Sequence, residues 1–484
     1  MSSPSPALCA AAAASCSTPL RVASPVVRFR RSGAPASVVS AARAAAAAPA
    51  VSDDLVLRIA EQLEDSVGAS SPLLDPLRSA SALSLLSTRW PTRRSNEAYR
   101  FTDISYLRSL PISLPSQPLA VAPPASPYAS HVHFSDGVLT SSSGAHVSAL
   151  ADIPPGRVRD RAAAALAASA EFADKDIFYD FNAVGAKDVA VVHVPEGVSM
   201  ADDPVHIMFS YSGCGDGSMM MSNPRVLVVA EKGAEVAIIE EHFGVGQEDG
   251  GCYWANPVME IIVEENAKVV HSYVQQQSFV AAHTKWTVVQ QNTSSNYEFV
   301  EASIGARLNR HNLHIQQLGP ETNTQLSTFH FSAQNKQIHD LHSKLILDHP
   351  RGRSHQIHRL IASGTGNGIF DGNIKVNRYA QQTDAGQETK CLLLSSKALV
   401  NVKPNLQIIA DDVKCTHGAA ISGEHDPNAI YFLQARGIDA KTAADALNFA
   451  FGAHVINQIP FKPIEKKTLS HFKALLASSR QNEK

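Results

Sequence analysis

The middle of the chain, from about residue 190 to 420, alternates apolar and polar residues with few helical patterns in between. Short segments with this pattern cover residues 189–192, 225–229, 236–239 and 259–263. A period of two is typical of β-strands. A doubly wound α/β fold needs a helix after each parallel strand, so the pattern excludes that class.

A weak internal repeat runs through the same region. EKGAEV at 231–236 recurs as EENAKV at 264–269 and again as IGARL at 304–308, at steps of 33 and then 39 residues. A turn residue followed by an Ala-x-Val-like segment at quasi-regular spacing is typical of stacked rungs. We therefore predict a parallel β-solenoid whose rungs lie about 4.8 Å apart. The alternative all-β class is a sandwich or jelly roll.

Helical patterns flank this region. Apolar residues at helical spacing occur near 53–66, 72–89 and 157–184, and again after Gly423, where Asp426-Pro427 and Asp439 each precede a helical stretch. The predicted class is mainly β, a right-handed parallel β-helix flanked by helical regions. The expected domains are an N-terminal helical region with a linker at 51–185, the solenoid core at 186–422 and a C-terminal helical domain at 423–484.

The first 52 residues contain no Asp, Glu or Lys, are rich in Ala, Ser and Pro, and carry five arginines. An acid-free start of this kind is typical of an organelle transit peptide, which we place at 1–50. A disordered tail is the alternative. The Ser, Pro and Ala bias favours a plastid over a mitochondrion.

Composition excludes several classes. Net charge is −3 and the pI is about 6.7, so no nucleic-acid footprint is present. No apolar run approaches the roughly 20 residues that span a bilayer. None of the six cysteines forms a C-x-x-C pair, which argues against a zinc ribbon or a ferredoxin-type cluster held by this chain alone.

Cys415 and His417 are the leading candidate ligands. Residues two apart on a strand share a face, with Cα atoms roughly 6.5 Å apart. Two ligands cannot complete a cluster that normally takes four, so the pair predicts a site shared with another chain. From the residues alone, such a pair on a strand is more often a core thiol beside a hydrogen-bonded histidine.

Eight histidines fall between residues 311 and 358, and three pairs have H-x-x-H spacing. On strands, positions i and i+3 face opposite ways and cannot chelate one ion. We predict hydrogen-bonded histidines on the solenoid faces, with transient iron or sulfur handling as the alternative. The histidines are His311, His314, His330, His339, His342, His349, His355 and His358.

Other motifs have ordinary interpretations. The segment 364–368, GTGNG, lacks the Lys-Ser/Thr ending of a phosphate loop and is predicted to be a turn between rungs. No P-loop occurs anywhere in the chain. Cys391 is predicted to fill the core, and Asp371 and Asp384 are predicted to form turns. Apolar residues on more than one face of the C-terminal helices require a partner surface or the solenoid's end to cover them.

Several short motifs occur in a fixed order in the C-terminal third: GNG at 366–368, FDG at 370–372, AQQTDA at 380–385, LLLS at 392–395, ADDVKCTHG at 410–418, YFL at 431–433 and ARGI at 435–438. In these motifs the chain resembles the SufB/SufD scaffold family of iron–sulfur cluster assembly. SufB-type members carry a sulfur-accepting cysteine after the leucine run, where this chain has Ala398. The Cys-Thr-His-Gly motif resembles the SufD type.

The resemblance implies a non-catalytic scaffold subunit in the chloroplast stroma. It would pair through its solenoid with SufB, contribute Cys415 and His417 to a transient iron–sulfur cluster at their junction, and pass clusters to acceptor proteins. The ABC-type ATPase SufC would dock on the C-terminal helices, with Phe449 and Phe451 as contacts. The resemblance leaves flavin binding open.

Two other classes of protein are alternatives to a scaffold subunit. A β-solenoid polysaccharide lyase or hydrolase needs clustered carboxylates and a base on one groove. A cupin-like metalloenzyme needs His-x-His with further ligands, of which His131 and His133 offer only the start.

Overall fold

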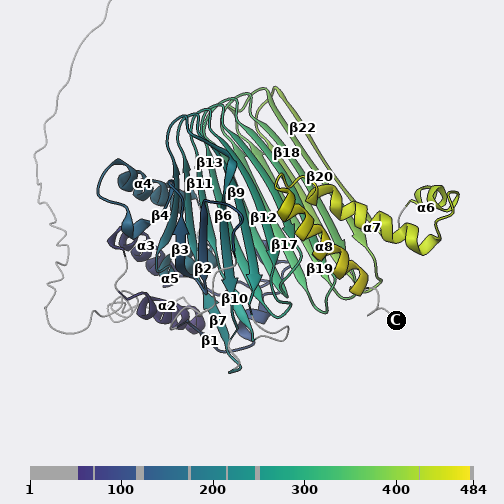
Figure 1. Ribbon diagram of the computed structural model, residues 1–484, viewed down its shortest axis with the longest axis horizontal. Coiled ribbons are helices and arrows are strands. Elements are labelled where there is room, and N and C mark those ends of the chain that lie inside the picture. Colours follow the sequence, from purple (N-terminus) through teal and green to yellow (C-terminus); the bar gives the residue numbers. More distant parts are fainter. Residues whose placement is uncertain are drawn as a thin grey trace, which may run out of the picture. The chain divides into compact units, whose positions relative to one another are not determined.

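The computed structural model describes residues 53–68, 71–115, 125–172, 176–213, 216–245, 251–423 and 426–479 (Figure 1). The expected transit peptide, 1–50, lies outside these residues.

Two long parallel sheets form the body of the structure, and the chain alternates between them. Sheet A contains β5 (Val189–Val194), β8 (Arg225–Ala230), β11 (Val258–Val263), β13 (Ala282–Gln291), β15 (Leu308–Gln317), β17 (Ile338–Leu347), β19 (Asn367–Val376) and β21 (Leu399–Ile408). Sheet B contains β6 (Ser199–Tyr211), β9 (Glu235–Gly244), β12 (Lys268–Gln276), β14 (Asn296–Ser303), β16 (Asn323–Ser332), β18 (Arg353–Ala362), β20 (Thr383–Leu393) and β22 (Val413–Ser422). The result is a β-solenoid of about seven turns, which confirms the predicted fold class.

The register of the rungs corrects the sequence repeat. Ala234 and Ala267 are equivalent, because the residues after them pair between β9 and β12. Ala306 is not their equivalent, because it precedes β15 and therefore lies at the other corner of the coil. Both corners reverse the chain through left-handed backbone, with φ of 58° at Asn266 and 63° at Ala306, so both produce a similar short motif. From β9 onward, true rungs in sheet B recur every 27 to 33 residues.

Helices cover the outer faces of both sheets (Figure 1). The N-terminal helices α2 (Asp54–Val67), α3 (Asp75–Leu85), α4 (Arg157–Phe172) and α5 (Ile177–Gly185) lie beside the early strands, and apolar residues of α2, α3 and α5 share a core with Trp254 and Trp286 of sheet A. On sheet B, α7 (Ala440–Ile456) and α8 (Lys462–Ser479) pack against Phe329, Phe331 and Ile361. The side of the solenoid thus covers these two helices, whereas α6 (Pro427–Gln434) has no buried residue.

Three short strands extend the sheets before residue 150, where the sequence pattern predicted none. They are β2 (His131–Ser135), β3 (Val138–Ser143) and β4 (Val147–Ala149). Strand β2 pairs parallel to β6 and antiparallel to β3, while β4 pairs antiparallel to β5. Short antiparallel strands therefore end both sheets on the N-terminal side.

The remaining elements are short. They comprise β1 (Ile112–Ser113), β7 (Met219–Ser222), β10 (Tyr253–Ala255) and four 3-10 turns at Pro72–Leu74, Glu97–Tyr99, Ser105–Arg108 and Leu150–Asp152. Among the helices that the structure describes, none combines the length and apolar character needed to cross a bilayer.

Candidate functional site

Cys415 and His417 lie on β22, the terminal strand of sheet B, as the sequence predicts. In the parallel register Cys415 pairs with Ala385 and His417 with Gln387 of β20. Cys415 is half-buried and packs against the core inside the solenoid, so its neighbour at i+2 shares the inward face. His417 is exposed. The strand thus presents a thiol and an imidazole side by side at the rim of the solenoid.

The last turn, β21 with β22, leaves the C-terminal end of the solenoid open. Each of these strands pairs on one side only within the described sheets, so each carries a free edge of backbone N–H and C=O groups. Large apolar side chains are exposed on the same turn, with Leu399 61% and Ile421 49% exposed. An unpaired edge lined with apolar residues is typical of a surface that a partner covers.

The environment of Cys415 disfavours a free thiolate. Burial raises the pKa of its thiol, and the nearby Asp384 carboxylate raises it further. Metal binding at this thiol would therefore release a proton. Within the described residues, no cluster of three or more His, Cys, Asp or Glu side chains could hold a metal ion. The pair therefore has no third ligand from this part of the chain.

Two acidic residues that the sequence predicted to form turns lie on strands instead. Asp371 and Asp384 lie within β19 and β20 and form no turn. Their glycine-containing surroundings resemble turns because the narrow interior of the solenoid also requires glycine on strands, as at Gly372. Cys391, in contrast, fills the core as predicted. It is buried beside Leu360, and burial raises the pKa of its thiol to about 12.

A fully buried network of charged and polar groups occupies the solenoid interior, and sequence reasoning missed it. The carboxylate of Glu240 lies 2.6 Å from Nε2 of His242 and 2.9 Å from Nε2 of His271, and it also accepts a hydrogen bond from Lys285. All four side chains are completely buried. Burial lowers the pKa of His242 to about 4 and also lowers that of His271, while the cations and hydrogen bonds around Glu240 hold its pKa well below the usual range.

The histidine-rich stretch contributes a second interior group. Glu301 accepts hydrogen bonds from His311 Nδ1 at 2.9 Å and His330 Nε2 at 2.8 Å, and His358 bonds Thr328 at 2.8 Å. These contacts confirm the interpretation of hydrogen-bonded histidines.

The H-x-x-H partners of these interior residues lie on the opposite face of their strands, as predicted. Whereas His311 and His339 are inside the solenoid, His314 and His342 line a cavity on the outer face of sheet A.

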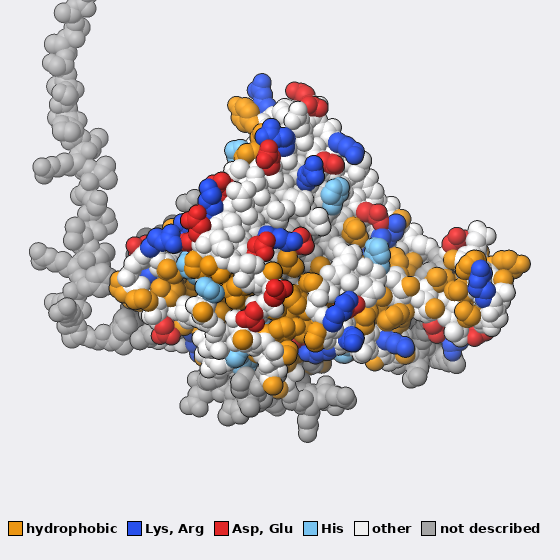
Figure 2. Space-filling model, turned by 45° about the horizontal axis from the view of Figure 1, so that its top comes forward, with side chains coloured by type: hydrophobic (Ala, Val, Ile, Leu, Met, Phe, Trp, Pro, Cys, Tyr) orange, Lys and Arg blue, Asp and Glu red, His pale blue; other side chains and the backbone are white. Residues whose placement is uncertain are grey.

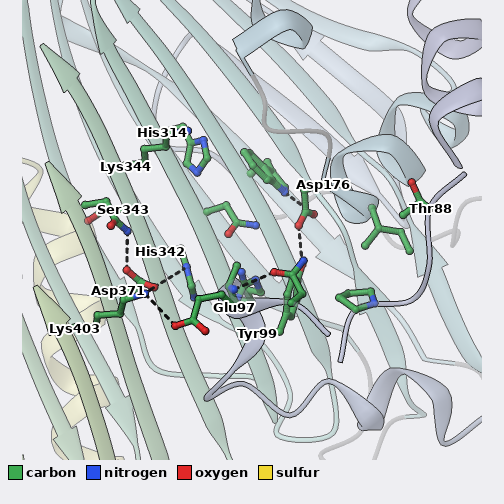
Figure 3. A pocket seen from close by; sticks show the side chains of 18 of the residues that line it. Thr88, Glu97, Tyr99, Asp176, His314, His342, Ser343, Lys344, Asp371 and Lys403 are labelled. Carbon is green, nitrogen blue, oxygen red and sulfur yellow. Dashed lines mark hydrogen bonds and ion pairs between the residues drawn. The ribbon is translucent and has the colours of Figure 1, made fainter. Parts of the chain in front are cut away.

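That cavity has a volume of about 440 Å³ and lies between sheet A and the segment 88–99 (Figure 3). His342 Nε2 lies 3.0 Å from Asp340, and Lys403 Nζ lies 3.5 Å from both Asp371 and Glu97. The carboxylates at this cavity are thus paired with basic side chains. The residues that line the cavity come from widely separated segments of the chain, so no local sequence motif could have predicted the cavity.

Phe449 and Phe451 are half-buried against their own chain. Phe449 stacks on Phe472 of α8 with ring centroids 5.8 Å apart, and the Arg359 guanidinium lies 5.6 Å from the Phe451 ring. Both rings therefore help to hold α7 in place, and their role as partner contacts stays a prediction.

The exposed apolar residues of the C-terminal domain lie instead on α6, where Tyr431 is 71% and Phe432 55% exposed. Figure 2 shows apolar side chains on this protruding segment. An adjacent groove of about 600 Å³ runs between α6, α7 and Leu392 and Leu394.

Comparison with known proteins identifies the family. The family model for the SUF system FeS cluster assembly SufBD core domain matches residues 213–451. Protein ABCI7, chloroplastic, of Arabidopsis thaliana is 44% identical over 88% of this chain and 91% of its own length. An iron–sulfur cluster assembly SufBD family protein of Synechocystis is 35% identical over 60% of this chain and 64% of its own length. The iron–sulfur cluster assembly protein SufD of Escherichia coli is 27% identical over 61% of this chain and 68% of its own length.

The matched region spans most of the solenoid, α6 and the larger part of α7, and therefore includes Cys415 and His417. The chain belongs to the SufBD family of iron–sulfur cluster assembly proteins.

Proposed function

We propose that this chain is a SufD-type scaffold subunit that pairs with a SufB-type partner through the open end of its solenoid. The observation that carries the proposal is the position of Cys415 and His417 on the terminal strand, with no third ligand among the described residues. A site with two ligands at an open edge gains the others when a second chain covers that edge. The cluster is the cargo of this site, held until an acceptor protein takes it.

A plastid location is part of the proposal. It is supported by the acid-free, Ser-, Pro- and Ala-rich first 52 residues and by the chloroplastic relative from Arabidopsis. Purification of the mature chain from plastids, with identification of the proteins that accompany it, tests location and partners together. Recovery without a SufB-type chain would contradict the proposal.

The purified chain is expected to hydrolyse no ATP, because its sequence contains no P-loop. Phosphate release from ATP should stay at the buffer background and should appear only when a SufC-type ATPase is added. ATP turnover that follows this chain through purification and changes with a mutation in it would contradict the scaffold role.

The SufC-type partner is expected to use α6 and the adjacent groove. Replacing Tyr431 and Phe432 together with Ser should weaken binding of that partner at least tenfold, because a few apolar anchors dominate most interfaces. Both side chains are exposed, so thermal stability should hardly change. Pull-down with the purified ATPase and a thermal melt measure the two effects.

Phe472→Ala provides the control for packing, because this fully buried residue of α8 is not a predicted partner contact. It removes the stacking on Phe449 and should lower thermal stability while binding of the ATPase by the folded chain is kept. Unchanged ATPase binding by the α6 variant would place the docking surface elsewhere.

A further inference from the structure

Gln387 is the neighbour of His417 in the stack of rungs. The two residues pair in register on β20 and β22, so their side chains leave the same face on rungs about 4.8 Å apart. Gln387 is 4% exposed and extends into the solenoid interior. A buried amide thus lies directly behind the exposed imidazole.

Hydrogen bonds across the interior define which end of this amide is free. Nε2 of Gln387 donates to Oε1 of Gln356 at 3.0 Å, and Nε2 of Gln356 donates to Ser343 Oγ at 2.8 Å. The amide nitrogen of Gln387 is therefore engaged. Its Oε1 is buried and has no hydrogen-bond partner. A buried acceptor without a donor costs about 1–3 kcal/mol, so a donor that reached this oxygen would be stabilising.

Gly372 on the facing sheet creates the space for this amide. A Cβ built at Gly372 would lie 2.3 Å from Nε2 of Gln387, a distance that two such atoms cannot share. The backbone at Gly372 does not need the left-handed region, so its missing side chain serves the close approach.

The neighbouring positions place no comparable acceptor in register with the imidazole. Ala385 lies behind Cys415, and the facing strand β19 contributes Phe370 and Ile374, which are apolar. Thr389 is buried on the same face and its Oγ1 also has no hydrogen-bond partner, but it pairs with Ala419, two residues beyond His417. Among the residues described at this end of the solenoid, Gln387 is thus the one buried polar neighbour in register with the imidazole.

We propose that Gln387 is a positioning residue for His417, an inference that rests on the proposed function. Its Oε1 accepts the N–H of one ring nitrogen of His417, which holds the tautomer and directs the other nitrogen to iron. Ligating histidines usually donate their second N–H in this way, and loss of the acceptor weakens metal binding by 10- to 100-fold. An amide acceptor, unlike a carboxylate, carries no negative charge, so it makes the imidazole only a moderate electron donor to the iron. A moderate bond to the iron suits a site that gives up its cluster.

The test uses the assembled complex and compares iron and acid-labile sulfide retained during a timed challenge with a chelator. Gln387→Leu should shorten retention about tenfold or more, and Gln387→Glu, which restores an acceptor oxygen, should recover it. Gly372→Ala should act like Gln387→Leu, because the added methyl group displaces the side-chain amide of Gln387 while Gln387 and His417 themselves are unchanged. Thr389→Val is the matched control on the same strand face and should leave retention unchanged.

The outcomes separate this inference from the proposed function. If His417→Ala loses the cluster while Gln387→Leu retains it, the positioning role is wrong and the shared site stands. If Gln387→Glu fails to recover what Gln387→Leu loses, the effect is one of packing and the inference is also wrong. If His417→Ala itself retains the cluster, the assignment of the site falls, and the inference falls with it.

Discussion

His417→Ala is expected to give a complex that assembles normally and holds little or no iron–sulfur cluster. The side chain is exposed on an edge strand, so its removal should change the free energy of unfolding by less than about 0.5 kcal/mol. Water cannot replace a lost imidazole ligand without weakening the whole site. Iron and acid-labile sulfide per assembled complex, measured beside a thermal melt, give the result.

Cys415→Ala should act in the same direction. Its thiol is half-buried against the core, so a small loss of stability should accompany the loss of cluster. Cys391→Ala is the matched control, because that thiol is also on sheet B but is buried among apolar residues. It should lower stability and leave cluster content per complex unchanged. Normal cluster content in both the His417 and Cys415 variants would show that this pair is an ordinary structural feature.

The solenoid should lose stability steeply as pH falls from 7.5 to 5. Burial lowers the pKa of His242 from its usual 6.5 to about 4, so below pH 6.5 the unfolded chain binds a proton that the folded chain does not. This histidine alone should cost about 2 kcal/mol of stability by pH 5. Burial also lowers the pKa of other interior histidines, which add in the same direction, namely His271, His283, His311, His339 and His358.

Urea unfolding at a series of pH values measures this effect as the slope of unfolding free energy against pH. The slope should be positive and should correspond to several protons between pH 6.5 and 5. His355→Ala is the matched control, because His355 is an exposed histidine of the same stretch and should leave the slope unchanged. A flat profile would mean that the interior histidines bind protons in the folded chain as readily as in the unfolded chain. The depressed pKa of Glu240 has the same sign but acts only at lower pH.

Local signals in the sequence predicted much of the fold. Strand periodicity located β5, β8, β9 and β11, and the caps of the C-terminal helices are as expected, with Asp426 and Asp439 each accepting a hydrogen bond from the first turn. Gly437 has φ of 84°, as a residue that ends a helix requires. These features depend on neighbours within a few positions, which a single sequence reveals.

Features that depend on the stacking of rungs could not be predicted in this way. The ion pair of Glu240 and Lys285 joins residues 45 positions apart across the interior, and neither residue belongs to a motif. The strand pattern identified Cys415 and His417, but Gln387 became a candidate only through the register of β20 and β22. Ala306 was misassigned because a sequence repeat does not distinguish one corner of a coil from the other.

The two ends of the solenoid differ in the strand edges that they offer to a partner. Strand addition can propagate a coil indefinitely when both of its ends are free, and the product is a filament. The short antiparallel strands β3 and β4 blunt the N-terminal end, and among the strands that the structure describes only β21 and β22 offer long parallel edges. A partner built on the same plan would use its own single open end in the contact. Under the proposed function, growth would then stop at two solenoid subunits. The asymmetry that leaves the proposed cluster site incomplete would also end the assembly once a partner completes that site.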